Sequence, residues 1–156
     1  MTIREALTHP WLTVRTQIAL GVFFVVAALP KIADPPSFAH MVYNYRLLPG
    51  PLVNLAALTM PWAELLMGIA LICGIWRRTA ATLVGTLLVV FIVAISVNLL
   101  RGNAIECGCF DVADAGKSVE ERFQDMWSVI FRDVGMLLLV AQGLLGADSA
   151  EERRAA

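Results

Sequence analysis

Two cysteines, Cys107 and Cys109, stand one residue apart in the segment RGNAIECGCFDVAD, residues 101–114, between two apolar runs. A disulfide needs its Cα atoms about 4.4–6.8 Å apart, so a bond between these cysteines requires a turn, which Gly108 permits. A bond that closes so small a ring is strained, and strained, exposed disulfides are oxidising and labile. The pair is therefore suited to thiol–disulfide exchange rather than to cross-linking a fold.

The same two thiols are also suited to binding a soft metal ion such as Cu(I), Zn(II) or Hg(II). Two sulfur ligands do not complete a tetrahedral zinc site. The third cysteine, Cys73, lies in an apolar run, where we expect a small buried residue. A soft-metal transporter or delivery protein that uses Cys107 and Cys109 is the alternative to a redox pair. A third possibility is an assembly factor in which the cysteines have no role.

A second chemical feature is Glu64, in the apolar segment MPWAELLMG. A carboxylate within a bilayer is costly and calls for a partner or a function. Candidate partners are Lys31 at the end of the first apolar run, Asn98 in the third and Arg132 in the fourth. Two interpretations stay open: pairing of Glu64 with Arg132 that fixes the helix register, and a proton relay.

The composition requires a membrane around these residues. Hydrophobic residues make up 58% of the 156-residue chain and charged residues 16%, and the mean hydropathy is +0.71. A soluble chain of this length has too little interior to bury so much apolar surface. A net charge of −1 gives no reason to expect a nucleic-acid partner. We therefore expect the lipid bilayer to be the main surroundings of the chain.

Four apolar stretches have the roughly 20 residues that a helix needs to cross a bilayer core. They are residues 12–30, 53–75, 79–100 and 127–145. After the first stretch, apolar residues recur at helical spacing from Phe38 to Leu48, which is typical of a short interfacial helix. Asp34 or Ser37 is expected to cap that helix, and Ser118 with Glu121 forms a capping box that should start a helix leading into the last stretch. The predicted fold is an all-α integral membrane protein, a single transmembrane domain over residues 1–156 with an up-down-up-down bundle of four helices.

The basic residues indicate an orientation. The 12 lysines and arginines divide equally between the two sides, but the tight Arg77–Arg78 turn and the N-terminal arginines favour their own side as cytoplasmic. Lys31 stands where a cleavable signal peptide would have a small residue, so the first stretch is expected to be a retained anchor. The expected location is the inner (cytoplasmic) membrane, with both termini inside and the Cys107–Cys109 loop outside.

The order of the segments GVFFVVAALPKIADPPSFAHMVYNYRLLP, PWAELLMGIALICG, LLRGNAIECGCF and FRDVGMLLL resembles the MauE/DoxX family of redox-associated membrane proteins. The resemblance covers about residues 20–145. It implies a four-helix membrane protein linked to thiol–disulfide chemistry outside the cytoplasm, beside a thioredoxin-like or maturing disulfide-containing protein. Some relatives use a quinone as the electron acceptor, which makes a quinone the candidate cofactor.

The resemblance also implies site residues. The family's CGCF motif matches Cys107, Gly108, Cys109 and Phe110, and its charged positions match Lys31, Glu64, Arg101 and Arg132. The chain departs from the family at Asp111, where glycine is common, and an acid there is expected to weaken the exchange activity. We predict a membrane thiol–disulfide oxidoreductase, or its accessory subunit, with Cys107 and Cys109 as the reacting residues.

Overall fold

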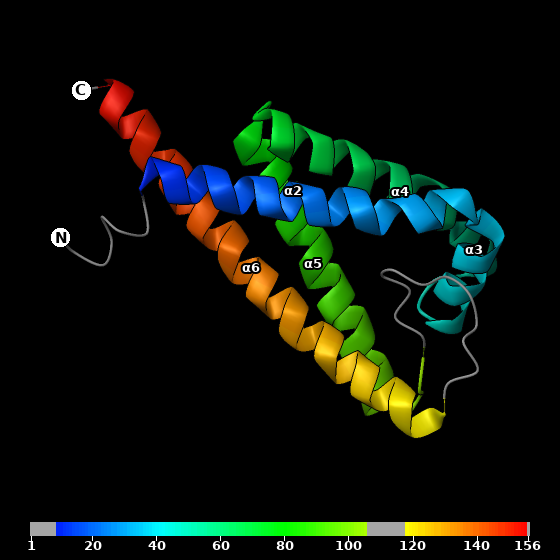
Figure 1. The fold of residues 1–156 in the computed structure, drawn as a ribbon. Helices are drawn as coiled ribbons and strands as arrows, with labels where there is room; N and C mark the ends of the chain where they lie inside the picture. The colour runs from blue at the N-terminus through cyan, green and yellow to red at the C-terminus, as the bar shows by residue number, and fades with distance from the viewer. Residues whose placement is uncertain (1–8, 106–117, 156) are drawn as a thin grey trace.

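The chain is described by a computed structural model that covers residues 9–105 and 118–155, with side chains described as far as residue 146. The described residues form helices and no strands (Figure 1). The helices are α2 (Pro10–Ala33), α3 (Pro35–Asn44), α4 (Gly50–Cys73), α5 (Arg77–Leu100) and α6 (Val119–Ala155). The predicted all-α fold is confirmed.

The four long helices alternate in direction. In Figure 1, α2 runs toward α3, α4 returns beside α2, α5 runs toward the α3 end again, and α6 returns to the end where α2 begins. The pairs α2 with α4 and α5 with α6 pack most extensively, and α2 also contacts α6. This is the predicted up-down-up-down bundle.

The helix ends follow local capping signals. The Asp34 side chain accepts a hydrogen bond of 3.2 Å from the Ser37 backbone N–H, so Asp34 is the cap of α3. The Ser118 backbone N–H donates to Glu121 Oε2 at 2.7 Å, and the Glu121 N–H donates to Ser118 Oγ at 3.3 Å. Both predicted caps are confirmed. The capping box starts α6 at Val119, and the helix then leads into the apolar stretch that begins at Trp127, as predicted.

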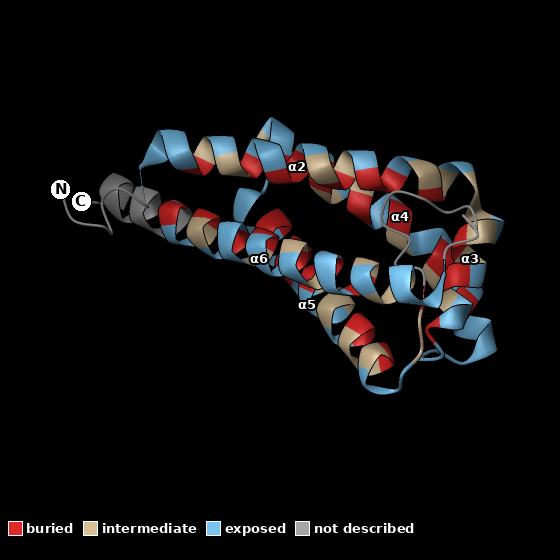
Figure 2. Ribbon diagram, turned by 60° about the horizontal axis from the view of Figure 1, so that its bottom comes forward, coloured by how far each residue is buried: buried red, intermediate tan, exposed pale blue. Residues whose placement is uncertain are grey.

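Four helices are long and apolar enough to cross a membrane: Pro10–Ala33, Gly50–Cys73, Arg77–Leu100 and the Val119–Gly146 part of α6. Their outward faces are apolar, as Leu66 (65% exposed), Val93 (55%) and Leu138 (67%) illustrate. Figure 2 shows exposed positions along the outer side of each helix and buried positions between the helices. Lipid is the solvent that such a surface requires, and the chain is a multi-pass membrane protein.

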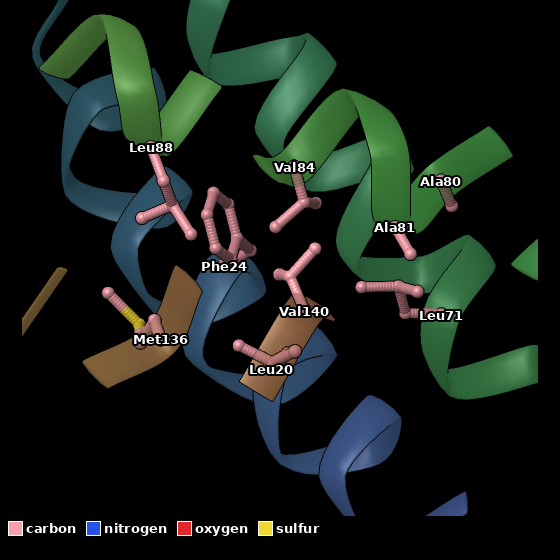
Figure 3. Close-up of a cluster of buried hydrophobic side chains, with 9 residues drawn as sticks. All are labelled: Leu20, Phe24, Leu71, Ala80, Ala81, Val84, Leu88, Met136 and Val140. Atoms are coloured by element: carbon pink, nitrogen blue, oxygen red, sulfur yellow. The ribbon is translucent and has the colours of Figure 1, made fainter. Parts of the chain in front are cut away.

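The core lies at the centre of the bundle, where all four long helices meet (Figure 3). It contains Leu20, Phe24, Leu71, Ala80, Ala81, Val84, Leu88, Met136 and Val140. Cys73 is not part of it: this cysteine is exposed at the end of α4, so its predicted burial is wrong. An apolar run with lipid on one side has an outward face that is as hydrophobic as its inward face.

Two glycines set the distance between α2 and α4. A Cβ built on Gly68 would lie 2.8 Å from the backbone oxygen of Gly21, and one built on Gly21 would lie 2.6 Å from the oxygen of Gly68. The two backbones therefore touch, as small residues in membrane helices allow. This contact fixes which residues of the two helices face one another.

Candidate functional site

A buried ion pair joins α2 to α4. The Lys31 ammonium donates to Glu64 Oε1 at 2.8 Å and to Oε2 at 2.7 Å. The two residues are each 2% exposed. Both carboxylate oxygens therefore face the same cation in a dry environment, where such an interaction is far stronger than in water.

Aromatic rings complete the surroundings of this lysine. The Lys31 nitrogen lies 5.4 Å from the ring centroid of Phe38 on α3 and 5.5 Å from that of Phe91 on α5. These distances are within the range of cation–π attraction. The ammonium thus contacts three other helices, α4 through a carboxylate and α3 and α5 through one ring each, although the sequence identified neither phenylalanine as a site residue.

Arg132 does not pair with Glu64, so that interpretation is wrong. Its guanidinium donates to Oδ1 of its neighbour Asp133 at 3.0 Å from Nε and 2.9 Å from Nη2, and lies 5.2 Å from the ring centroid of Phe23. Asp133 is 2% exposed, whereas the Arg132 side chain is 29% exposed. Lys31 lies nearer to Glu64 in the assembled bundle, because α2 and α4 are the helices in backbone contact.

The two ion pairs border one small cavity. Lys31, Glu64, Arg132 and Asp133, together named the charge cluster, line a space of about 20 Å³ between α2, α4, α5 and α6. This volume is enough for about one water molecule. The cluster contains two cations and two anions, so its formal charge is zero. Asp133 was not among the predicted site residues, although its acidic side chain within an apolar span was a signal for it.

Asn98 is not a partner of Glu64 either. This residue of α5 is 0% exposed and donates from Nδ2 to the backbone oxygens of Tyr45 at 3.1 Å and Ala94 at 3.0 Å. The Asn103 N–H donates to the Asn98 backbone oxygen at 3.0 Å. Asn98 therefore ties the turn after α3 to the turn that ends α5.

Arg101, at the end of α5, lies at the same end of the bundle as α3. Arg101 is the exposed C-cap of α5. Cys107, Gly108, Cys109 and Phe110 lie outside the described residues. Cys73 ends α4 at the opposite end of the bundle from α3 (Figure 1).

A polar cavity of about 730 Å³ lies at this end, between α3, the end of α5 and the start of α6. The described residues that line it are Pro36, Ser37, His40, Met41, Asn44, Arg46, Gly102, Asn103, Ala104, Ile105, Val119 and Arg122. Three basic side chains and no acidic ones are among them. Because these residues come from three distant parts of the sequence, no local motif predicted the cavity.

A separate apolar groove of about 160 Å³ lies between α3, α4 and α5. Its described lining is Phe38, Met41, Val42, Tyr45, Leu47, Leu48, Met60, Val90, Phe91 and Ala94, and no polar atom of these residues faces it. The groove is thus suited to hydrocarbon. It offers no hydrogen-bond donor to a polar group.

Comparison with known proteins agrees with this architecture. The family model of the methylamine utilisation protein MauE matches residues 9–146. A methylamine utilization protein MauE of Methylorubrum extorquens is 34% identical over 143 residues, which are 91% of this chain and 73% of the relative. The MauE proteins of Methylophilus methylotrophus and Paracoccus denitrificans are 38% and 35% identical, over 69% and 68% of this chain.

The match covers only 57% and 58% of the length of the last two relatives. No solved protein structure matches the chain. The likeness to DoxX proteins stays a prediction. The family match nevertheless extends from before α2 to the last apolar turns of α6, and so includes every membrane-spanning helix. The chain belongs to the MauE family.

Proposed function

We propose that this protein is a membrane thiol–disulfide exchange protein, or an accessory subunit of one, that serves methylamine utilisation. Cys107 and Cys109 would react with a thioredoxin-like or maturing disulfide-containing protein outside the cytoplasm. The observation that carries the proposal is the spacing of the two cysteines, one residue apart in the connection from α5 to α6 of a MauE-family bundle. The relatives' name supplies the link to methylamine.

The exchange follows from the two thiols. The thiolate of one cysteine attacks a sulfur of the partner's disulfide, a mixed disulfide forms, and the partner's other sulfur leaves as a thiolate. The second cysteine then attacks the mixed disulfide, which releases the partner's remaining thiolate and closes the Cys107–Cys109 bond. Two electrons pass to the partner in this direction. The reverse sequence oxidises a dithiol of the partner.

The described ends of the connection support this proposal. Asn103, near its beginning, is bonded to the buried Asn98, and Ser118, at its end, belongs to the capping box of α6. Both ends are thus held by hydrogen bonds to the bundle. A connection with both described ends fixed would keep Cys107 and Cys109 on one side of the membrane.

We assign Lys31, Glu64 and Arg132 to positioning rather than to proton transfer. Each has a charged partner within 3.0 Å, and the space between the two pairs holds about one water molecule. A proton relay requires a chain of such sites, whereas the neighbouring core between α2 and α6 is apolar. Arg101 would stabilise the C-terminus of α5, where a cation is favourable.

A quinone acceptor gains no support from the described residues. Its carbonyl groups need donors, but the apolar groove itself presents none, and the Lys31 ammonium within the bundle is already held by Glu64.

The proposed location is the inner membrane, with the cysteine pair on the outer side. Arg77 and Arg78 begin α5, directly after the short turn from α4, at the opposite end of the bundle from the end of α5. Positive charges in a short turn favour the cytoplasmic side. That turn inside would leave Cys107 and Cys109 outside.

Single cysteine variants test the exchange. Cys107→Ser or Cys109→Ser leaves one thiol without its resolving partner, so one of them should accumulate a covalent adduct in membranes of the native host. The adduct should disappear on reduction and be absent from the double variant, which serves as the control. Absence of an adduct from both single variants would refute exchange. Growth on methylamine, measured in the same strains, tests the pathway separately.

A further inference from the structure

We propose that the polar cavity and the apolar groove together form a binding site for one anionic phospholipid, with its phosphate at Arg46 and part of an acyl chain in the groove. The two spaces lie on opposite sides of α3 and share Met41 in their linings. Ser37, His40 and Asn44 face the cavity, whereas Phe38, Val42 and Tyr45 face the groove.

The charge of the cavity determines the sign of the head group. Arg46, Arg122 and His40 line it, and none of its described lining residues is acidic. Arg122 is engaged in further interactions, so the charge open to a ligand is that of Arg46. Within the described part of the chain, the Arg46 guanidinium has no hydrogen-bond or ion-pair partner, and the residue is exposed. An arginine can donate two parallel hydrogen bonds to a phosphate.

The position of Arg46 is built into the fold. Its φ angle is +50°, in the left-handed region that is unfavourable for a residue with a Cβ. The preceding Tyr45 is 7% exposed and packs in a cluster with Ile95 and Met126, while its backbone oxygen accepts a hydrogen bond from Asn98. The fold thus holds the turn rigidly, and it has an arginine where a glycine would be unstrained. A role for the arginine side chain accounts for that choice.

The turn after α3 also joins the two halves of the site. Arg46 lines the polar cavity, and the residues on either side of it, Tyr45 and Leu47, line the apolar groove together with Leu48. A charged group bound at Arg46 therefore lies next to a hydrocarbon-lined space at the membrane surface. An amphiphile satisfies both surfaces at once, whereas a soluble anion or an acidic peptide leaves the groove empty.

Lipid titration of the delipidated full-length chain in detergent, followed by native mass spectrometry, tests the site. Phosphatidylglycerol should bind at least about tenfold more tightly than phosphatidylcholine with the same acyl chains, because the choline cation of phosphatidylcholine offsets its phosphate and is repelled by the basic lining, whereas phosphatidylglycerol keeps a net negative charge. Arg46→Gly removes the charge and suits the positive φ, so this variant should fold well and lose the preference. Arg15→Gln changes an exposed arginine near the start of α2, at the other end of the bundle, and should keep it.

The variant Leu48→Asn tests the apolar half of the site. Leu48 is 40% exposed and lines the groove, so this variant should bind both lipids more weakly without changing their ratio. Inorganic phosphate at the same concentrations should displace little phosphatidylglycerol. The proposal is overturned if the wild type does not distinguish the two lipids, if Arg46→Gly keeps the preference, or if inorganic phosphate competes as strongly as the lipid does.

Discussion

The Lys31–Glu64 pair yields the sharpest energetic prediction, because each partner can be removed alone or together with the other. In Lys31→Met a carboxylate remains in the bundle interior without its cation, and in Glu64→Met an ammonium remains without its anion. The pair has two hydrogen bonds of 2.8 and 2.7 Å and side chains that are 3% and 2% exposed. At about 1.5–3 kcal/mol for each hydrogen bond to a charged group, their loss amounts to about 3–6 kcal/mol.

Each single variant should therefore lose about 3–5 kcal/mol of unfolding free energy, the usual cost of breaking a buried pair. The double variant Lys31→Met, Glu64→Met should be close to the wild type or more stable, because two apolar side chains then replace two desolvated charges. Reversible unfolding in mixed detergent micelles, followed by circular dichroism, measures all four proteins of this double-mutant cycle.

Additive single effects of less than about 1 kcal/mol each would show that the pair behaves as an exposed one and would refute the reasoning. The same double variant also separates the two interpretations of Glu64. A positioning role predicts that it still supports the mixed disulfide in a Cys107→Ser or Cys109→Ser background. A proton relay predicts that the exchange is lost although the protein is stable.

Three further predictions concern the bundle itself. Gly68→Ala places a Cβ 2.8 Å from a backbone oxygen of α2 and should cost about 1–3 kcal/mol in the same unfolding assay, whereas Gly135→Ala, with no atom within 4 Å of its Cβ, should be neutral or slightly stabilising. The Asp34 carboxyl has a pKa held below its usual range by hydrogen bonds from the Ser37 hydroxyl and N–H, so its stabilisation of α3 is present above about pH 4 and is lost as the pH falls through the lower folded-state pKa. Hydrogen exchange should therefore show an acid-induced loss of α3 protection in the wild type. Asp34→Asn, also a good cap, should lack that loss. Asn98→Leu removes the side chain that donates to the Tyr45 backbone oxygen, so it should cost about 1–3 kcal/mol of unfolding free energy and speed proteolysis near Tyr45. An unchanged cleavage rate would contradict the proposal that Asn98 holds the turn after α3.

The sequence predicted the helices well because their signals are local. Apolar length identifies a span, and the caps at Asp34 and Ser118 depend on side chains three residues from their partners. The capping box located the start of α6, whose polar first turns hydropathy does not detect. Cys73 was misjudged because apolar residues in a membrane protein face lipid as well as the core.

The partners within the site depended on tertiary packing and could not be read from the chain. Lys31, Asn98 and Arg132 were all candidate partners of Glu64, with Arg132 the one in the pairing interpretation. Lys31 is the actual partner because the backbone contact between Gly21 and Gly68 holds α2 against α4. The polar cavity likewise exists only where α3, α5 and α6 converge. The cysteine pair was recognisable for the opposite reason, since its chemistry depends on residues adjacent in sequence.

Thiol labelling in intact cells of the native host tests the central claim most directly. A membrane-impermeant maleimide is applied with and without prior reduction to cells that carry the wild type or the double Cys107→Ser, Cys109→Ser variant. Labelling that appears only after reduction, and only in the wild type, is the predicted result, because it means an oxidised Cys107–Cys109 pair outside the cytoplasm. Labelling that requires permeabilised cells and no reductant would mean free thiols inside, and it would contradict an extracytoplasmic disulfide exchange.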